Sequence, residues 1–214
     1  MPQTLPRVVP APPGKPIRPE ASASQQTSEA IARNPSQWSA TAAREVVRRY
    51  TELAPHWNDD RGGYRPVPLA DALARGGLPA GRRCVEVGCG TGLLTPLLTE
   101  VWSEVVCVDL TPEMLRRSSA PWRLLGDASR LPLAAGFADA VILADVPLFA
   151  DEVVRVLAPS GAVVWSNALG MDAPHHVPVE TVCSALERAS GGAPWSAVAA
   201  EAGWGLWAVL RPAA

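Results

Sequence analysis

The feature that most constrains the fold of this chain is the segment Cys84-Val85-Glu86-Val87-Gly88-Cys89-Gly90-Thr91-Gly92. Its first half is typical of a short buried strand, and three glycines at alternate positions follow. Because glycine has no Cβ, the backbone there can bend tightly and a ligand can approach it closely. A helix expected from Leu93 to Leu98 would direct its free N–H groups and the positive end of its dipole toward the turn. The segment therefore predicts a nucleotide-binding turn between a strand and a helix.

Downstream of this turn, expected strands alternate with expected helices. Strands are expected at Glu104 to Asp109, Trp122 to Leu125, Asp139 to Leu143 and Ala162 to Ser166, and helices at Thr111 onward, Phe149 to Leu157 and Val179 to Ala189. The hydroxyl of Thr111 is expected to cap the helix that Pro112 begins. Residues 195–210 resemble two strands that meet at Gly203-Trp204-Gly205. This alternation predicts a parallel sheet with helices on both faces and an antiparallel hairpin at one edge.

The beginning of the chain has a different character. Residues 1–36 are rich in proline and poor in large apolar side chains, which predicts a disordered tail, with a partner-docking arm as the alternative. Residues 37–214 are expected to form a single domain, in which residues 37–79 supply N-terminal helices and a lid and residues 80–214 form the core. Ser39 or Thr41 can cap the first helix of this domain.

Composition limits the classes of partner. The chain has 214 residues, of which 48% are hydrophobic, and its net charge of −2 favours neither nucleic acid nor an anionic membrane as a partner. No apolar run reaches the roughly 20 residues that span a bilayer, and no apolar segment follows Arg7, so a cytoplasmic protein is expected. The four cysteines form no C-x-x-C pair, and we expect reduced thiols and no metal site. Nothing in the sequence sets the oligomeric state.

The spacing of the glycines separates the classes of nucleotide site. A G-x-x-x-x-G-K-[ST] loop is excluded because Leu93 and Leu94 follow Gly92. A dinucleotide turn has the pattern G-x-G-x-x-G, but here Leu93 fills the place of the third glycine. The large side chain disfavours the close helix–strand packing of that turn, so the pattern is G-x-G-x-G.

Carboxylates gather at the expected ligand-binding edge of the sheet. Asp109 follows Gly90 by 19 residues, at the end of the second strand, where an acid can bind both hydroxyls of a ribose. Asp127 and Asp145 end the next two strands, and Glu86 lies in a buried strand, where it needs a cationic or hydrogen-bonding partner. Such acids would repel a pyrophosphate and would favour a nucleoside that carries amino and sulfonium groups.

Four motifs in this order carry a family resemblance. They are residues 85–92, Val108-Asp109, Gly126-Asp127-Ala128 with Leu131-Pro132, and residues 155–161. Over roughly residues 40–214 the chain resembles the class I S-adenosylmethionine-dependent methyltransferases. The resemblance implies an enzyme of the α/β class whose cofactor is S-adenosyl-L-methionine. It also implies a Rossmann-like, doubly wound, mostly parallel seven-stranded sheet with an antiparallel C-terminal edge hairpin and helices on both faces.

The resemblance also implies which residues bind the cofactor. Gly88, Gly90 and Gly92 would line its methionine and ribose portion, Glu86 would face the amino-acid end, and Asp109 would bind the ribose hydroxyls. Leu110 would flank the adenine, and Asp127 with Ala128 would contact its amino edge. Cys89 and Asp145 complete the expected cofactor site.

The acceptor side is less defined by the sequence. His175 and His176 are candidates for a general base, and the alternative is a pair of solvent-exposed loop histidines. Tyr50, Trp57, Tyr64 and Asn167 are candidates for contacts with the substrate. The segment Asp145-Val146-Pro147-Leu148 matches only half of the D-P-P-[YF] motif of enzymes that methylate planar amino groups.

These features favour a methyltransferase that acts on an O, N or C atom of a small molecule by in-line displacement. Little of the chain remains outside the core to build a substrate cap, which favours a small or medium acceptor. The alternatives are a protein or RNA methyltransferase, a nicotinamide-dependent oxidoreductase, and a non-catalytic S-adenosylmethionine-binding accessory protein.

Overall fold

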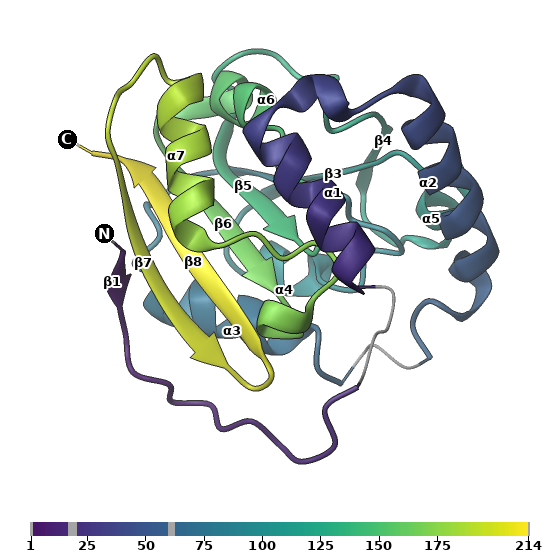
Figure 1. The fold of residues 1–214 in the computed structure, drawn as a ribbon, viewed down its shortest axis with the longest axis horizontal. Coiled ribbons are helices and arrows are strands. Elements are labelled where there is room, and N and C mark those ends of the chain that lie inside the picture. The colour runs from purple at the N-terminus through teal and green to yellow at the C-terminus, as the bar shows by residue number, and fades with distance from the viewer. Residues whose placement is uncertain (1, 17–20, 60–62, 214) are drawn as a thin grey trace.

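The computed structural model describes residues 2–16, 21–59 and 63–213, and an eight-stranded sheet forms its centre (Figure 1). The strand order is β1-β7-β8-β6-β5-β2-β3-β4. The bounds are β1 Gln3–Thr4, β2 Arg83–Val87, β3 Glu104–Asp109, β4 Trp122–Leu125, β5 Ala138–Ala144, β6 Leu157–Asn167, β7 Trp195–Ala202 and β8 Gly205–Pro212. Strands β2 to β6 pair in parallel, whereas β8 lies antiparallel between β6 and β7. The predicted parallel sheet and C-terminal hairpin are confirmed, and β1 adds an eighth strand to the seven expected.

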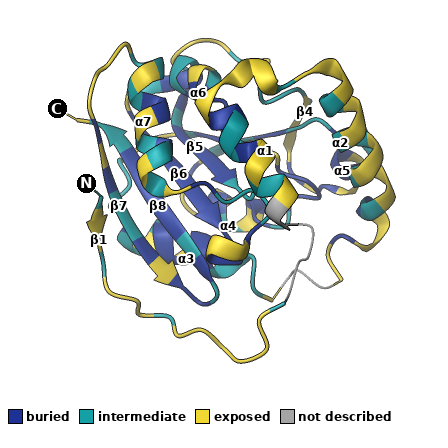
Figure 2. Cartoon of the chain, in the orientation of Figure 1, coloured by how far each residue is buried: buried dark blue, intermediate teal, exposed yellow. Residues whose placement is uncertain are grey.

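Alternate residues of the central strands face opposite layers of the core. In β5, Val141 and Leu143 face one apolar cluster, and Ala140 and Ile142 face the other. All four are at most 1% exposed. Strands buried on both faces require continuous apolar runs, which explains why these segments show no alternation of polar and apolar residues. Figure 2 shows the buried strands enclosed between helices whose outer surfaces are exposed.

Helices cover both faces of the sheet. The helices are α1 Ala21–Arg33, α2 Ala40–Leu53, α3 Pro66–Arg75, α4 Thr95–Thr99, α5 Pro112–Arg117, α6 Ala150–Val156 and α7 Val179–Ala189. Helices α6 and α7 contribute side chains to one apolar cluster, whereas α3 and α4 contribute to the other. No helix among the described residues has the length and apolarity needed to cross a membrane.

Two helix starts differ in detail from the sequence predictions. Ser39 caps α2 as expected, because its Oγ accepts a hydrogen bond from the N–H of Ala42 at 3.2 Å. The hydroxyl of Thr111 makes no cap bond to α5; instead the Thr111 N–H donates to Asp109 Oδ1 at 2.7 Å. The helix expected from Leu93 begins only at Thr95, because the glycine turn extends to the Thr95 N–H, which donates to the Gly92 carbonyl.

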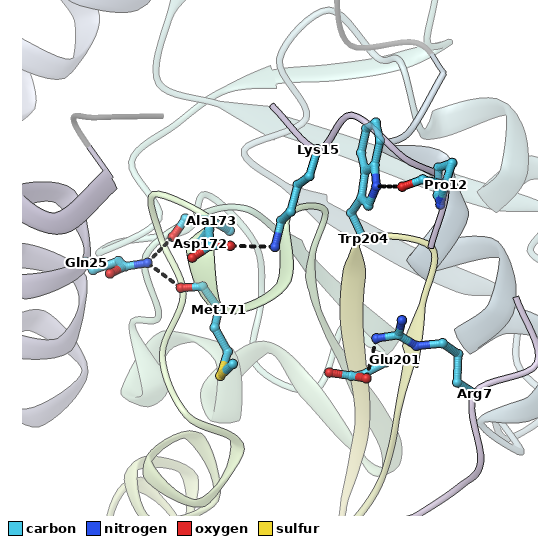
Figure 3. Close-up of polar contacts among 9 residues, drawn as sticks. All are labelled: Arg7, Pro12, Lys15, Gln25, Met171, Asp172, Ala173, Glu201 and Trp204. Atoms are coloured by element: carbon cyan, nitrogen blue, oxygen red, sulfur yellow. Dashed lines mark hydrogen bonds and ion pairs between the residues drawn. The ribbon is translucent and has the colours of Figure 1, made fainter. Parts of the chain in front are cut away.

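The prediction of a disordered tail at residues 1–36 is at odds with the structure of residues 2–16 and 21–36, which are the described part of this segment. Residues 2–16 run alongside the C-terminal hairpin in space (Figure 3). There β1 pairs in parallel with β7, the Trp204 Nε1–H donates to the Pro12 carbonyl, and Arg7 pairs with Glu201. These contacts satisfy the hydrogen-bonding groups of the backbone and side chains without requiring many large apolar residues. The low apolar content of the segment therefore could not predict them.

Helix α1 is also packed against the core. Ile31 and Ala32 are 1% and 4% exposed, and Arg188 of α7 donates to the Ala32 carbonyl at 3.2 Å. Nearer the start of the helix, the Gln25 amide donates to the carbonyls of Met171 and Ala173 (Figure 3). A few buried side chains and these polar contacts attach a helix whose composition is mostly small and polar.

Candidate functional site

The glycine turn connects β2 to α4 at the carboxyl edge of the sheet. Gly88, Gly90 and Gly92 all have positive φ values, of 67°, 57° and 77°. A Cβ at Gly88 would lie 2.2 Å from Cγ1 of Val146, and one at Gly92 would lie 2.5 Å from Oγ of Ser118. Both the left-handed backbone and the close neighbours therefore require glycine.

Asp109 at the end of β3 holds this turn from the side. Its Oδ2 accepts a hydrogen bond from the Gly90 N–H at 2.8 Å, and its Oδ1 accepts one from the Thr111 N–H at 2.7 Å. Burial raises the pKa of Asp109, and the backbone hydrogen bonds offset only part of this shift. The carboxylate lies at the wall of the main cavity, where its remaining lone pairs can accept hydrogen bonds from a ligand.

Glu86 is the buried acid of β2, and its side chain is directed away from the main cavity. The Thr95 hydroxyl donates to Glu86 Oε2 at 2.6 Å, and the Cys107 thiol lies 3.4 Å from the same oxygen. These contacts provide the hydrogen-bonding partner that burial of the acid requires. Burial raises the pKa of Glu86 well above its usual value. Through Thr95, Glu86 joins the turn to the first residue of α4.

The main cavity runs along the ends of the parallel strands and encloses about 820 Å³, including its open mouth. Its walls come from the strand ends, from α2, from the loop that leads to α3 and from the loop that leads to α7. The lining residues are Trp38, Val46, Tyr50, Trp57, Arg65, Val87, Gly88, Gly90, Val108, Asp109, Leu110, Thr111, Met114, Gly126, Asp127, Ala128, Ala144, Asp145, Val146, Pro147, Phe149 and His175. A predominantly apolar cavity with a few placed polar groups is typical of a small-molecule site.

Most of the predicted site residues meet in this cavity, but several do not. Those that line it are Gly88, Gly90, Asp109, Leu110, Asp127, Ala128, Asp145, Tyr50, Trp57 and His175. Those that do not are Glu86, Cys89, Gly92, Asn167 and His176, whereas Tyr64 lines a second, adjoining pocket. Gly92 and Cys89 thus act on the shape of the turn, since the Cys89 side chain is buried behind it.

Trp38 closes one end of the cavity, and the sequence analysis missed it. Its Nε1–H donates to Asp127 Oδ2 at 2.9 Å, and its ring meets the Phe149 ring edge-on at 5.6 Å between centroids. A second tryptophan, Trp57, covers the glycine turn, because a Cβ on Gly90 would lie 3.5 Å from its Nε1. The only sequence signal for Trp38 was an aromatic residue at the border of the proline-rich segment.

The two histidines have different environments. His175 lines the cavity, with Nδ1 at 2.9 Å from the Ser28 hydroxyl of α1 and Nε2 at 3.4 Å from the Tyr50 hydroxyl. His176 does not line it, and its Nδ1 lies 3.0 Å from Oδ1 of the fully buried Asn167. Neither is a solvent-exposed loop histidine, because both are partly buried. Burial lowers the pKa of His175 to about 4, although the nearby charge of Asp145 opposes this shift, so the imidazole is neutral at pH 7.

Asp145 follows β5 with a φ of 55°, a left-handed conformation that non-glycine residues seldom adopt. Its carboxylate accepts from the Ala168 N–H at 3.2 Å and lies 3.3 Å from the guanidinium of Arg65. The guanidinium also stacks over the Trp57 ring at 4.8 Å from its centroid. Arg65, which the sequence analysis did not single out, therefore connects the acid at the strand end to the aromatic cover.

Comparison with known proteins agrees with this geometry. Residues 85–165 match the sequence profile of the family described as Methyltransferase domain. An uncharacterized methyltransferase of Mycobacterium tuberculosis (strain H37Rv) is 41% identical over 100 residues, which are 41% of this chain and 41% of that protein. The trans-aconitate 2-methyltransferase of Azoarcus sp. (strain BH72) is 34% identical over 159 residues, which are 67% of this chain and 59% of that protein. The alignments thus span less than two thirds of either relative.

The fold is also similar to that of a solved structure. A solved structure described as the DhpI-SAH complex superposes with a TM-score of 0.60 at 20% identity, covering 82% of this chain and 98% of that one. The matched profile shows a methyltransferase domain over residues 85–165, and the similarity to the solved structure shows a shared fold. S-adenosylmethionine is the cofactor that the four ordered motifs indicate for this domain.

Proposed function

We propose that this protein transfers the methyl group of S-adenosylmethionine to an O, N or C atom of a small molecule. The observation that carries the proposal is the cavity itself, in which the glycine turn and Asp109 are met from the other side by Trp38, Tyr50 and Trp57. This aromatic cover borders the cavity opposite the glycine turn, and the cavity opens to solvent at its mouth. The name of the Azoarcus relative, trans-aconitate 2-methyltransferase, supports a small acceptor for this chain as well.

In this proposal the cofactor lies along the strand ends. Gly88 and Gly90 approach its methionine and ribose portion, and Asp109 accepts hydrogen bonds from the ribose hydroxyls. Leu110 flanks the adenine, whose amino edge meets Asp127 and Ala128. Glu86 and Gly92 support the shape of the turn from behind instead of touching the ligand.

The chemistry needs alignment more than it needs a proton acceptor. In an in-line displacement the acceptor atom forms a bond to the methyl carbon while the bond from carbon to sulfur breaks, and the sulfonium loses its charge. The rings of Tyr50 and Trp57 can face the positive sulfonium through cation–π attraction. In this proposal His175, which lines the cavity, contacts the acceptor, and as a neutral imidazole it would accept a hydrogen bond through Nε2 in place of its long 3.4 Å contact with the Tyr50 hydroxyl.

An acceptor screen tests this function. The full chain is incubated with S-adenosylmethionine and a panel of small hydroxyl, amine and carboxylic acid compounds, and S-adenosylhomocysteine is measured together with the mass of the product. We expect turnover with at least one small molecule and its loss in Asp109→Ala. Binding of S-adenosylhomocysteine without turnover on the panel, combined with methylation of an RNA or protein substrate, would contradict the proposal.

A further inference from the structure

Ser28 is a polar residue among the buried side chains of α1. Of residues 23–33 in this helix, Ser28, Ile31 and Ala32 are buried, with exposed fractions of 0%, 1% and 4%. A buried hydroxyl costs free energy unless it makes a hydrogen bond. The Ser28 hydroxyl makes its bond with His175, whose Nδ1 lies 2.9 Å from the serine Oγ. The histidine therefore explains why a polar side chain is tolerated at this position of the helix.

This bond engages one nitrogen of the His175 ring and leaves the other for the cavity. His175 lines the main cavity, and its Nε2 has a 3.4 Å contact with the Tyr50 hydroxyl, which is long for a hydrogen bond. Each ring nitrogen can donate or accept one hydrogen bond, depending on which of them carries the proton. Whichever direction the bond to Ser28 takes, it uses Nδ1. Nε2 is therefore the nitrogen that remains for a ligand.

Helix α1 also holds the backbone that carries His175. Gln25 lies three residues before Ser28, so the two side chains lie on the same face of the helix. The Gln25 amide donates to the carbonyls of Met171 and Ala173 at 2.7 and 2.8 Å (Figure 3). One face of α1 thus fixes both the loop that precedes the histidine and the orientation of the ring itself.

These contacts lie outside the matched methyltransferase domain. The match covers residues 85–165, which include the expected cofactor residues Asp109 and Asp127. Ser28 and Tyr50 precede the matched region, and His175 follows it. This placement favours a role on the acceptor side of the cavity over a role in cofactor binding.

We propose that Ser28 is a positioning residue for methyl transfer, because its bond to Nδ1 of His175 holds the ring with Nε2 toward the acceptor. Without a fixed partner, the imidazole could rotate about its side-chain bonds and move its proton between the two nitrogens. A misplacement of about 1 Å in such a group can lower a rate about 100-fold. The inference rests on the proposed function, because it deepens the role of His175 in the same site.

The first test is long-range 1H–15N NMR correlation of the imidazole rings in the full chain, saturated with S-adenosylhomocysteine at pH 7. The pKa of His175 is about 4, so its ring is neutral at this pH. The chain has three histidines, and His175→Gln identifies the signals of His175. We expect one protonated and one unprotonated nitrogen in the unmodified chain. In Ser28→Ala the two nitrogen shifts should approach each other, because both tautomers become populated.

Thr27 provides the matched control for this test. Its hydroxyl is exposed on the same helix and donates to the Ala23 carbonyl at 3.0 Å, so it contacts no part of the His175 loop. Thr27→Ala should leave the His175 signals unchanged. Both Thr27→Ala and Ser28→Ala should bind S-adenosylhomocysteine within about twofold of the unmodified chain, since neither residue lines the cavity.

The second test uses an acceptor identified by the screen described above. Ser28→Ala should lower kcat about tenfold or more and keep the KM for S-adenosylmethionine within about twofold. Ser28→Thr, which retains the hydroxyl, should recover most of kcat, and Thr27→Ala should retain all of it. A role of Ser28 in packing alone would not predict recovery that depends on the hydroxyl.

Three results would overturn the inference. They are unchanged His175 signals in Ser28→Ala, averaged nitrogen shifts already present in the unmodified chain, and a Ser28→Thr variant with unmodified His175 signals but the kcat of Ser28→Ala. A chain without turnover on any acceptor would contradict the proposed function instead, and the NMR comparison would still decide whether Ser28 holds the ring. A proton on Nε2 would contradict the hydrogen bond that the proposed function assigns to that nitrogen, and would leave the role of Ser28 in place.

Discussion

The two sides of the site are built in different ways. The strand-end side consists of the glycine turn and the acids after β3, β4 and β5, which the parallel sheet brings to one edge. The cover consists of α1, Trp38, α2 and the loop around Trp57, which pack through a few buried side chains and are joined to the rest of the domain by hydrogen bonds between distant parts of the chain. The bond from Trp38 to Asp127 spans 89 residues, and the contact of Ser28 with His175 spans 147. The topology of the sheet therefore determines the position of the strand-end residues, whereas contacts of individual side chains determine the position of the cover.

The largest expected effect is on the backbone of the strand-end side. Gly88→Ala places a Cβ 2.2 Å from Val146 at a φ of 67°, and overpacking together with the left-handed conformation should lower the free energy of unfolding by about 3 kcal/mol. Gly136 is the matched control, because its φ is 65° and a Cβ there would meet no atom within 4 Å. Gly136→Ala should cost about 1 kcal/mol in urea denaturation. Equal losses in the two variants would contradict the close approach at Gly88.

The next effect is the pH dependence of stability that arises from His175, which contacts the cover. The pKa of His175 is about 4 in the folded chain, below the usual 6.5, so the unfolded chain binds the proton more readily between these values. Stability from this group is complete above pH 6.5 and is lost as the pH falls toward 4, by up to about 3 kcal/mol. Its surroundings include Ser28, Tyr50 and the charges of Arg49, Arg65 and Asp145.

Urea denaturation at pH 7 and pH 4.5 measures this loss. His175→Gln should show a smaller decrease in stability between the two pH values than the unmodified chain. His56, whose side chain is 83% exposed, provides the control, and His56→Gln should behave as the unmodified chain does. The same pH dependence in His175→Gln would mean that the imidazole is not held neutral by the cover.

A third effect concerns the ligand. Asp109→Ala should weaken binding of S-adenosylhomocysteine about 10- to 100-fold in calorimetry, because it removes charge-assisted hydrogen bonds to the ribose and the support of the Gly90 N–H. Asp151→Ala, at an exposed acid in the first turn of α6, should bind as the unmodified chain does. An unchanged affinity in Asp109→Ala would place the ribose elsewhere.

The smallest expected effect is on the cover. Trp38→Phe keeps an aromatic ring against Phe149 but removes the donor to Asp127, a loss of about 1 kcal/mol at most. Its affinity for S-adenosylhomocysteine should therefore change by no more than about fivefold. A loss as large as that of Asp109→Ala would mean that cofactor binding depends on the cover as much as on the strand ends.

The same division explains what the sequence could predict. The sheet, the hairpin and the cavity positions of Gly88, Gly90, Asp109 and Asp127 follow from local patterns and from the rule that parallel strands end at one edge. The tail at residues 1–36 was predicted to be disordered because its apolar content is low. Its attachment instead uses backbone pairing by β1 and long-range hydrogen bonds, and local composition carries no sign of these.

Arg65 and Trp38 illustrate the same limit within the site. Each lies outside any motif, and each contacts residues that a local pattern does not bring near it, Asp145 and Trp57 for Arg65, and Asp127 and Phe149 for Trp38. Glu86 shows the reverse case, because its burial and its need for a partner were predicted from the strand. The identity of that partner, the Thr95 hydroxyl, depended on where α4 begins.

The central claim is that the strand-end side of the cavity binds the cofactor and that the cover borders the acceptor. A crystal structure of the full chain with S-adenosylhomocysteine tests it most directly. The account predicts the ribose hydroxyls within hydrogen-bond distance of Asp109, the adenine beside Leu110 and Asp127, and the sulfur facing the space shared by Tyr50, Arg65 and His175. A ligand whose ribose lies away from Asp109, or whose sulfur faces away from that shared space, would contradict the account.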